Sequence, residues 1–238
     1  MRKARRPQGG NILFLILLAV VLFAALSYAV TSGMRGGGNS ASKESLQSQV
    51  AALQNTVMGV RSSLLRMTTT GGYQPWQIDY SKTNNSQSTA NATCTTTACQ
   101  LFDPAGGAVS ALLPSTAWND VSVCSDTTYG RPTFSNISVK GIGTDSQRDL
   151  MLVYLGVKRD LCMAINDVNG VANPGGEPPG DQTSGSQAYT GTLTQEVPLS
   201  ASPQLGDEEP SLAGKQMFCA AFTNPSPCYR LYAVLIER

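Results

Sequence analysis

Residues 12–30 (ILFLILLAVVLFAALSYAV) constrain this chain more than any other feature, because the run is apolar almost throughout and carries no charged residue. A helix rises ~1.5 Å per residue, and a helix that spans a membrane needs about 20 predominantly apolar residues. The run therefore predicts a transmembrane helix over 11–31.

The charges that flank this run predict its orientation. Four basic residues precede it, namely Arg2, Lys3, Arg5 and Arg6, whereas Arg35 is the first to follow it. Because basic flanks stay on the cytoplasmic side, we expect a single-pass inner-membrane protein with a cytoplasmic leader, 1–10, and a periplasmic or extracellular C-terminal domain. A secretory signal cleaved after 27–29 is the alternative, although the apolar regions of such signals are shorter, roughly 7–15 residues.

The cysteines indicate an oxidising compartment. All six follow the apolar run: Cys94, Cys99, Cys124, Cys162, Cys219 and Cys228. An even number of cysteines in an exported region is typical of disulfides. Zinc is the alternative, but the spacings are not CxxC pairs and the chain has no histidine. We expect disulfides, including a local Cys94–Cys99 bond, and no cofactor.

Charge and composition argue against two classes of function. Charged residues make up only 14% of the chain and the net charge is +1, so the sequence has no basic patch that would bind nucleic acid. The absence of histidine removes the commonest general base, together with Ser–His and Cys–His nucleophile pairs. We expect neither nucleic-acid binding nor enzymatic activity.

A second helix is predicted over 40–68, after a Gly-rich joint at 32–39. Each of the three consecutive glycines in the joint costs about 1 kcal/mol relative to alanine in a helix. Apolar residues then recur in steps of three and four, at Leu46, Val50, Leu53, Val57, Val60, Leu64 and Met67. This stripe predicts an amphipathic helix that begins near Ser42 and packs on the chain's own domain, with a short coiled coil as the alternative.

Residues 69–238 are predicted to form one β-rich exported domain. Strand-like runs occur at 121–124, 134–139, 149–155, 190–197, 215–222 and 229–236. The last two flank a Pro-rich turn and predict a terminal hairpin, while helical spacing over 158–169 predicts a short helix with Cys162 facing the core. The predicted fold class is α+β: a long N-terminal helix, transmembrane and then amphipathic, packed on a small antiparallel sheet with disulfides.

Ligand-binding candidates are few. Asp167 and Asn169 begin a pattern typical of a calcium loop, but the twelfth position holds Pro178 where glutamate is expected, and a turn that ends a helix explains the pattern more simply. Four aromatic residues could either contact a surface ligand or belong to the core: Trp76, Trp118, Tyr129 and Tyr189.

The order of these features resembles the type IV pilin superfamily, which includes pilins and the pseudopilins of type II secretion. In that family a basic leader ends in a glycine, a prepilin peptidase cuts after it, and an apolar helix follows. Gly10 matches that glycine, so the resemblance implies cleavage between Gly10 and Asn11. The family's helices bundle into a filament core, which implies other pilin-like subunits as partners. The anchor also resembles that of pilin-like bacterial membrane proteins of no established role.

Two positions depart from the family's pattern. The first mature residue would be Asn11, where the family prefers an apolar residue, and the fifth would be Leu15, where major subunits carry glutamate. That glutamate is thought to pair with a neighbour's terminal amine, and minor subunits at a filament tip lack it. The resemblance therefore implies a minor, tip or initiating, subunit. The alternative hypothesis is a permanently anchored periplasmic or surface domain that recognises an unknown ligand through its long loops.

Overall fold

The structure is a computed structural model that describes residues 10–81, 90–110, 116–120, 132–144, 148–181, 204–222 and 228–238, with the backbone alone over 10–13 and 29–41. Its α-helices and strands are α1 (Gly10–Thr69), β1 (Pro132–Ile137), β2 (Asp149–Leu155), α2 (Arg159–Asn169), β3 (Met217–Phe222) and β4 (Cys228–Ile236). Short 3₁₀-helices lie at Pro75–Gln77, Thr97–Cys99, Pro174–Gly176 and Pro210–Leu212. The chain divides into two compact units, Met1–Ser45 and Leu46–Arg238.

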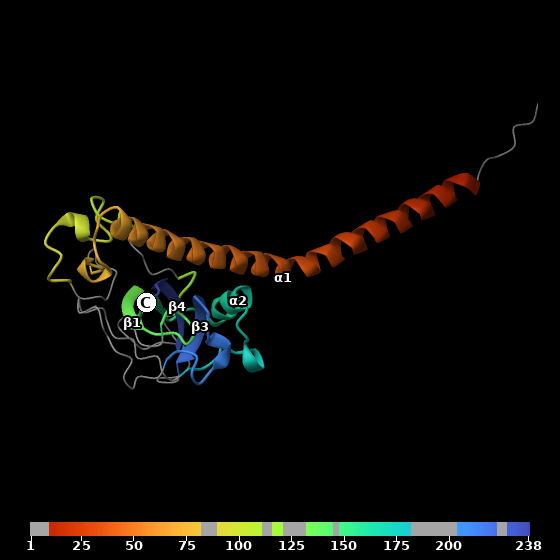
Figure 1. Cartoon of the computed structure of the whole chain (residues 1–238). Helices are drawn as coiled ribbons and strands as arrows, with labels where there is room; N and C mark the ends of the chain where they lie inside the picture. The colour runs from red at the N-terminus through yellow and green to blue at the C-terminus, as the bar shows by residue number, and fades with distance from the viewer. Residues whose placement is uncertain are drawn as a thin grey trace, which may run out of the picture. The chain divides into compact units, whose positions relative to one another are not determined.

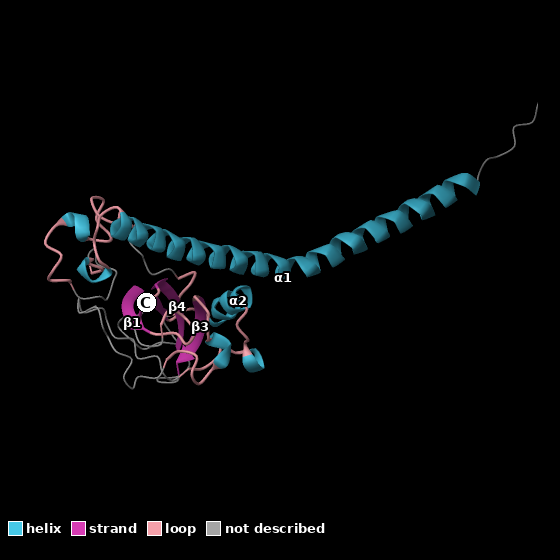
Figure 2. Cartoon of the chain, in the orientation of Figure 1, coloured by secondary structure: helices cyan, strands magenta, loops and turns pink. Residues whose placement is uncertain are grey.

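The second unit, which we call the head, is built on a four-stranded antiparallel sheet (Figure 1). The strand order is β1-β2-β4-β3, so β2 and β4 are central. The sequence-predicted strands at 134–139 and 149–155 and the terminal hairpin are confirmed as β1, β2 and β3–β4. The predicted strands at 121–124 and 190–197 lie outside the described residues. Figure 2 shows the strands gathered in one layer, with α2 beside β3. The fold is therefore α+β, as the sequence predicts.

Both faces of the sheet are buried. All seven residues of β2 are buried, which explains why the run that follows Asp149, Leu150–Leu155, contains no charged residue. Because side chains alternate along a strand, Leu150, Leu152 and Tyr154 enter one core, and Met151, Val153 and Leu155 enter another. The first core also receives α1 and α2. The second is completed by Val139, Ile142, Val171, Leu205 and Leu212 from connecting segments.

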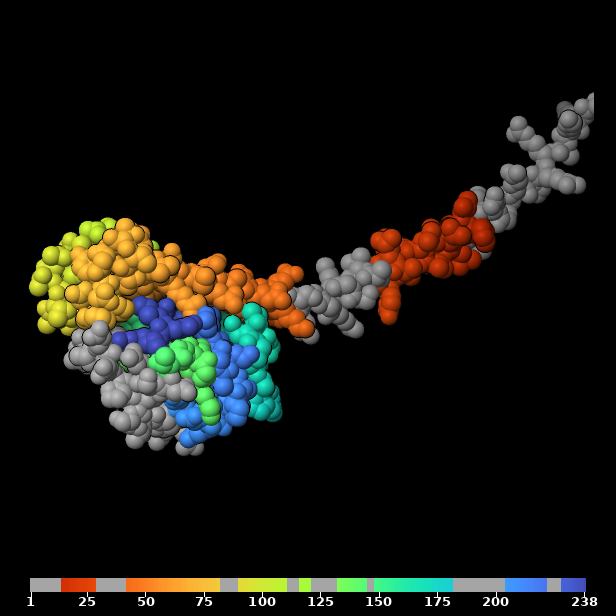
Figure 3. Space-filling model, viewed as in Figure 1, coloured from red at the N-terminus to blue at the C-terminus, as the bar shows by residue number. Residues whose placement is uncertain are grey.

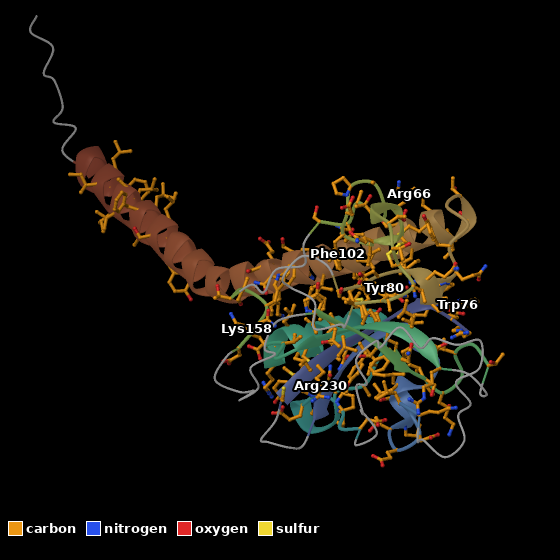
Figure 4. The ribbon with its side chains drawn as sticks, turned by 90° about the vertical axis from the view of Figure 1, so that its left-hand side faces the viewer. Arg66, Trp76, Tyr80, Phe102, Lys158 and Arg230 are labelled. Atoms are coloured by element: carbon orange, nitrogen blue, oxygen red, sulfur yellow. A yellow bond between two sulfur atoms is a disulfide. The ribbon has the colours of Figure 1, made fainter. Side chains whose placement is uncertain are left out.

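The C-terminal part of α1 covers the first core with the predicted apolar stripe. Six residues of the stripe are at most 4% exposed, and Leu46 packs against the same core while partly exposed: Leu46, Val50, Leu53, Val57, Val60, Leu64 and Met67. The prediction of an amphipathic helix packed on its own domain is confirmed. Figure 4 shows Tyr80 and Phe102 between this helix and the sheet, where both rings contact Phe134, at centroid distances of 5.0 Å and 6.0 Å.

The start of this helix differs from the sequence prediction. α1 is helical throughout 32–39, so the break at the glycines and the restart near Ser42 do not occur. The intrinsic cost of glycine is a weak preference, and helix propagation between two helical flanks overrides it. The helix ends at Thr69, as predicted, and Gly72 then adopts a positive φ of 70°.

The predicted span over 11–31 is helical, since it lies within α1. Among the residues that the structure describes, however, no helix is both long enough and apolar enough to cross a membrane. The transmembrane assignment therefore stays a prediction.

The edge strand β3 is tied to α2 by covalent and polar contacts. Cys162 and Cys219 form a disulfide with a Cα–Cα distance of 5.2 Å. The buried amide of Asn166 accepts a hydrogen bond from the Cys219 N–H at 2.8 Å and donates one to the Cys219 carbonyl at 2.9 Å. Ala221 N–H donates to the Pro179 carbonyl at 2.8 Å. The outer edge of β3 is therefore occupied at these two residues.

Candidate functional site

The most unusual surface of the described chain is the apolar helix surface, which we define as the side chains of residues 14–28. Its large apolar side chains are 46–77% exposed: Phe14, Leu15, Ile16, Leu17, Leu18, Val20, Val21, Leu22, Phe23, Leu26 and Tyr28. Because five of them are consecutive, they point to all sides of the helix. Figure 3 draws this segment in red, with these side chains on its surface. A helix that is apolar on every side requires an apolar environment.

The predicted processing site lies at the beginning of the same helix. Gly10 is the first residue of α1 and Asn11 the second. Residues 1–9, including the basic leader, lie outside the described residues. Cleavage between Gly10 and Asn11 therefore stays a prediction.

The described cysteines are disulfide-bonded, as is typical of a protein in an oxidising compartment. Cys94 and Cys99 form the predicted local disulfide, with a Cα–Cα distance of 5.6 Å, and close the loop that contains the 3₁₀-helix Thr97–Cys99. Cys162 pairs with Cys219, as described above, and Cys228 is also disulfide-bonded. Cys124 lies outside the described residues. The prediction of disulfides is confirmed for the described cysteines.

The calcium candidates, Asp167 and Asn169, lie at the end of α2. The Asp167 carboxylate accepts a hydrogen bond from the Asn173 amide at 2.8 Å, and the Asn169 amide donates to the Ile165 carbonyl at 2.7 Å. Gly170 ends the helix in the left-handed conformation, at φ 65°. These contacts make the segment a helix terminus. Among the described residues, no group of three acidic, cysteine or histidine side chains is placed to bind a metal.

A buried carboxyl group in the head, that of Asp149, has a strongly raised pKa. The Asp149 carboxylate is fully buried at the start of β2 and accepts hydrogen bonds from the backbone N–H groups of Arg238, at 3.0 Å, and Val139, at 3.5 Å. Burial raises its pKa from the ordinary value of 3.8 to about 6, although these two donors act in the opposite direction. Asp149 thus fastens the C-terminal end of the chain to the sheet, and its charge depends on pH.

Two of the four predicted contact aromatics lie in the described chain, and both are half-buried. Trp76 packs against the first core from a 3₁₀-helix, and Trp118 packs edge-on against Tyr154, with ring centroids 6.4 Å apart. Tyr129 and Tyr189 lie outside the described residues. Both tryptophans pack against the first core, from separate segments of the chain.

Trp118 does line a pocket that the sequence did not predict. The pocket lies beside α1 in the head and has a volume of about 350 Å³. Its described lining comes from α1, β2 and the segments 108–110 and 118: Asn55, Thr56, Gly59, Val60, Ser63, Ala108, Val109, Ser110, Trp118 and Tyr154. A glycine inside the strong helical pattern is the signal that could have pointed to it.

No protein-family model, curated protein or solved structure matches this chain.

Proposed function

We propose that this protein is a membrane-anchored, pilin-like minor subunit, acting at the tip or the initiation point of a type IV pilus or a type II secretion-type filament. The observation that carries the proposal is the apolar helix surface, which belongs to the same helix as the buried stripe of a disulfide-bonded head. Burial of apolar area contributes about 25 cal/mol per Å², so this surface favours lipid or other apolar helices over water.

Pilin-like assembly would provide both environments in turn. The helix first resides in the inner membrane, with the N-terminus in the cytoplasm and the head outside, and then packs among the helices of other subunits. In lipid, helices associate through close packing of small residues. Ala19, Ala24 and Ala25 lie exposed on the apolar helix surface, where they allow such an approach.

The minor role is supported by Leu15. In the pilin family the glutamate at the corresponding position is thought to pair with the terminal amine of a neighbouring subunit, and leucine cannot form that ion pair. A subunit without this pair fits a position with no subunit ahead of it. Leu15 itself is 58% exposed on the apolar helix surface.

The mature N-terminus tests the proposal. The full chain would be produced in membranes with and without a prepilin peptidase, and its N-terminus determined by mass spectrometry. We expect a peptidase-dependent start at Asn11, loss of cleavage in Gly10→Leu, and unchanged cleavage in the control Gly9→Ala. A start at Val30 would contradict the proposal, because it indicates ordinary secretion.

A second candidate function, a permanently anchored ligand-binding domain, is favoured by the pocket beside α1. The same measurement distinguishes the two functions. An N-terminus that stays at Met1 in the presence of the peptidase supports the permanent anchor.

A further inference from the structure

The pocket beside α1 has the size of a small-molecule site. Its volume of about 350 Å³ lies within the range of roughly 300–1,000 Å³ found for ligand pockets. Its wall combines the apolar surfaces of Val60, Val109 and Trp118 with neutral polar groups, and no charged residue is among its described lining. A neutral ligand therefore suits it better than an ionic one.

Gly59 keeps the α1 side of the pocket open. A glycine inside a helix costs about 1 kcal/mol relative to alanine, so such a position usually has a packing reason. Among the described residues no such reason is found: a Cβ added at Gly59 would meet none of their atoms within 4 Å, and Gly59 does not have a positive φ. The missing side chain thus leaves free volume at the pocket and serves no close contact in the described chain.

Tyr154 lines the pocket and carries a buried hydrogen-bonding group that is not used within the described chain. Its side chain is only 1% exposed, and its hydroxyl has no hydrogen-bond partner among the described residues. A buried polar group without a partner costs about 1–3 kcal/mol. Burial raises the pKa of Tyr154 well above its ordinary value, so the hydroxyl remains protonated and can donate a hydrogen bond.

Hydrogen bonds hold the backbone at Trp118, whose ring forms the aromatic wall of the pocket. The Trp118 carbonyl accepts a hydrogen bond from Lys158 N–H at 2.8 Å, and the Asn119 amide donates to the Leu155 carbonyl at 3.0 Å. The Trp118 ring meets the Tyr154 ring at 89°. An aromatic wall of this kind favours a flat aromatic partner, because aromatic rings prefer stacked or edge-on contacts with one another.

We propose that this pocket binds a neutral, flat aromatic molecule that carries a hydrogen-bond acceptor, with the Tyr154 hydroxyl donating to the acceptor and Trp118 contacting the ring. The free volume beside Gly59 accommodates the ring, and the acceptor provides the hydrogen-bond partner that the Tyr154 hydroxyl lacks in the described chain. The site is independent of filament assembly, because it lies wholly within the head.

The test uses the full chain in detergent and two probes of matched shape, 1-indanone, which has a carbonyl acceptor, and indane, which has none. Trp76→Phe leaves Trp118 as the single tryptophan of the chain, so its fluorescence reports binding. We expect saturable binding of 1-indanone. Tyr154→Phe should weaken that binding about tenfold, the equivalent of one hydrogen bond, and leave the affinity for indane unchanged.

Tyr154→Phe also separates binding from folding. Because the hydroxyl has no partner, its removal should raise the melting temperature of the free head while lowering the affinity for 1-indanone. If Tyr154 had only a structural role, Tyr154→Phe would not combine a higher melting temperature with a lower affinity for 1-indanone. Equal affinities of the parent and Tyr154→Phe for 1-indanone would overturn the proposal.

A second variant blocks the pocket without weakening the helix. Gly59→Leu places a side chain in the free volume and improves helix propensity, so it should abolish 1-indanone binding in a fully folded protein. Ser62→Leu, at an exposed residue of α1 that is not among the described lining of the pocket, is the matched control and should bind normally. Unchanged binding by Gly59→Leu, or no saturable signal from the parent up to the solubility limit of 1-indanone, would refute the site.

Discussion

Two stretches of α1 use apolar residues in opposite ways. Residues 14–28 present them on every side, and all the large ones are exposed, whereas residues 46–69 bury one stripe and expose mostly polar residues. Both stretches are helical, so hydrophobicity alone does not determine what a helix contacts. A helix with an apolar stripe, repeated every three or four residues, packs on one partner surface. A helix that is apolar on all sides requires only an apolar environment.

The largest expected effect comes from a matched pair of leucine-to-alanine substitutions, one in each stretch of α1. Leu53→Ala removes a side chain that is 1% exposed and should destabilise the head by about 2–5 kcal/mol, because it leaves a cavity in the first core. Leu18→Ala, at a side chain that is 46% exposed, should leave the unfolding of the head unchanged. Chemical denaturation followed by near-UV circular dichroism compares the two. Similar losses of stability would mean that both stretches pack on the head.

The next effect concerns pH and should be confined to the head. The pKa of Asp149 is about 6 in the folded state and 3.8 as its ordinary value, so the folded head binds more protons between these values. The contribution of Asp149 to stability should therefore be fully present below pH 3.8 and be lost as the pH rises through 6, by up to about 3 kcal/mol. Denaturation at several pH values measures this slope, which Asp149→Asn should abolish. A slope that persists in Asp149→Asn would assign the effect to another group.

A smaller effect tests the polar contacts that accompany the buried stripe. Arg66, near the end of α1, donates from its guanidinium to the carbonyls of Gly106, at 3.0 Å, and Gly107, at 2.8 Å (Figure 4). Arg66→Met should destabilise the head by about 1 kcal/mol, because it removes both hydrogen bonds. The control Leu65→Ala, at a side chain that is 63% exposed, should be neutral. Denaturation midpoints decide the outcome, and equal midpoints for all three proteins would show that this contact is dispensable.

The smallest effect lies between the two stretches. Gly37→Ala should stabilise the helix locally by about 1 kcal/mol, because α1 is continuous there and alanine is the better helix former. Amide hydrogen exchange over 32–39 should become slower, while the melting of the head stays the same. Faster exchange in this variant would indicate that the glycines serve a conformation other than the helix.

Periodicity and composition were sufficient to predict much of the head. The stripe from Leu46 to Met67, the uninterrupted apolar run of β2 and the Cys94–Cys99 bond all depend on residues close in sequence. The Cys162–Cys219 bond joins residues 57 positions apart, and its pairing depends on how α2 docks on β3. Local propensity failed at the glycines of α1, where cooperativity of the helix prevailed.

The pocket was beyond prediction for a related reason. In the sequence Tyr154 is an ordinary member of an apolar strand, and only its surroundings in the fold show that its hydroxyl is unsatisfied. Gly59 is informative only when the empty space around it is known. Among the predicted site residues, Trp118 is the one that the structure places in this pocket.

The amide of Asn166 has a consequence for how heads can meet. An unprotected edge strand is a template on which another chain can add a strand, and it promotes aggregation. Asn166 pairs with both backbone groups of Cys219 as a neighbouring strand would, and Pro179 takes the next outward N–H. Copies of the protein crowded at one location are thereby discouraged from adding a strand to β3 at these residues.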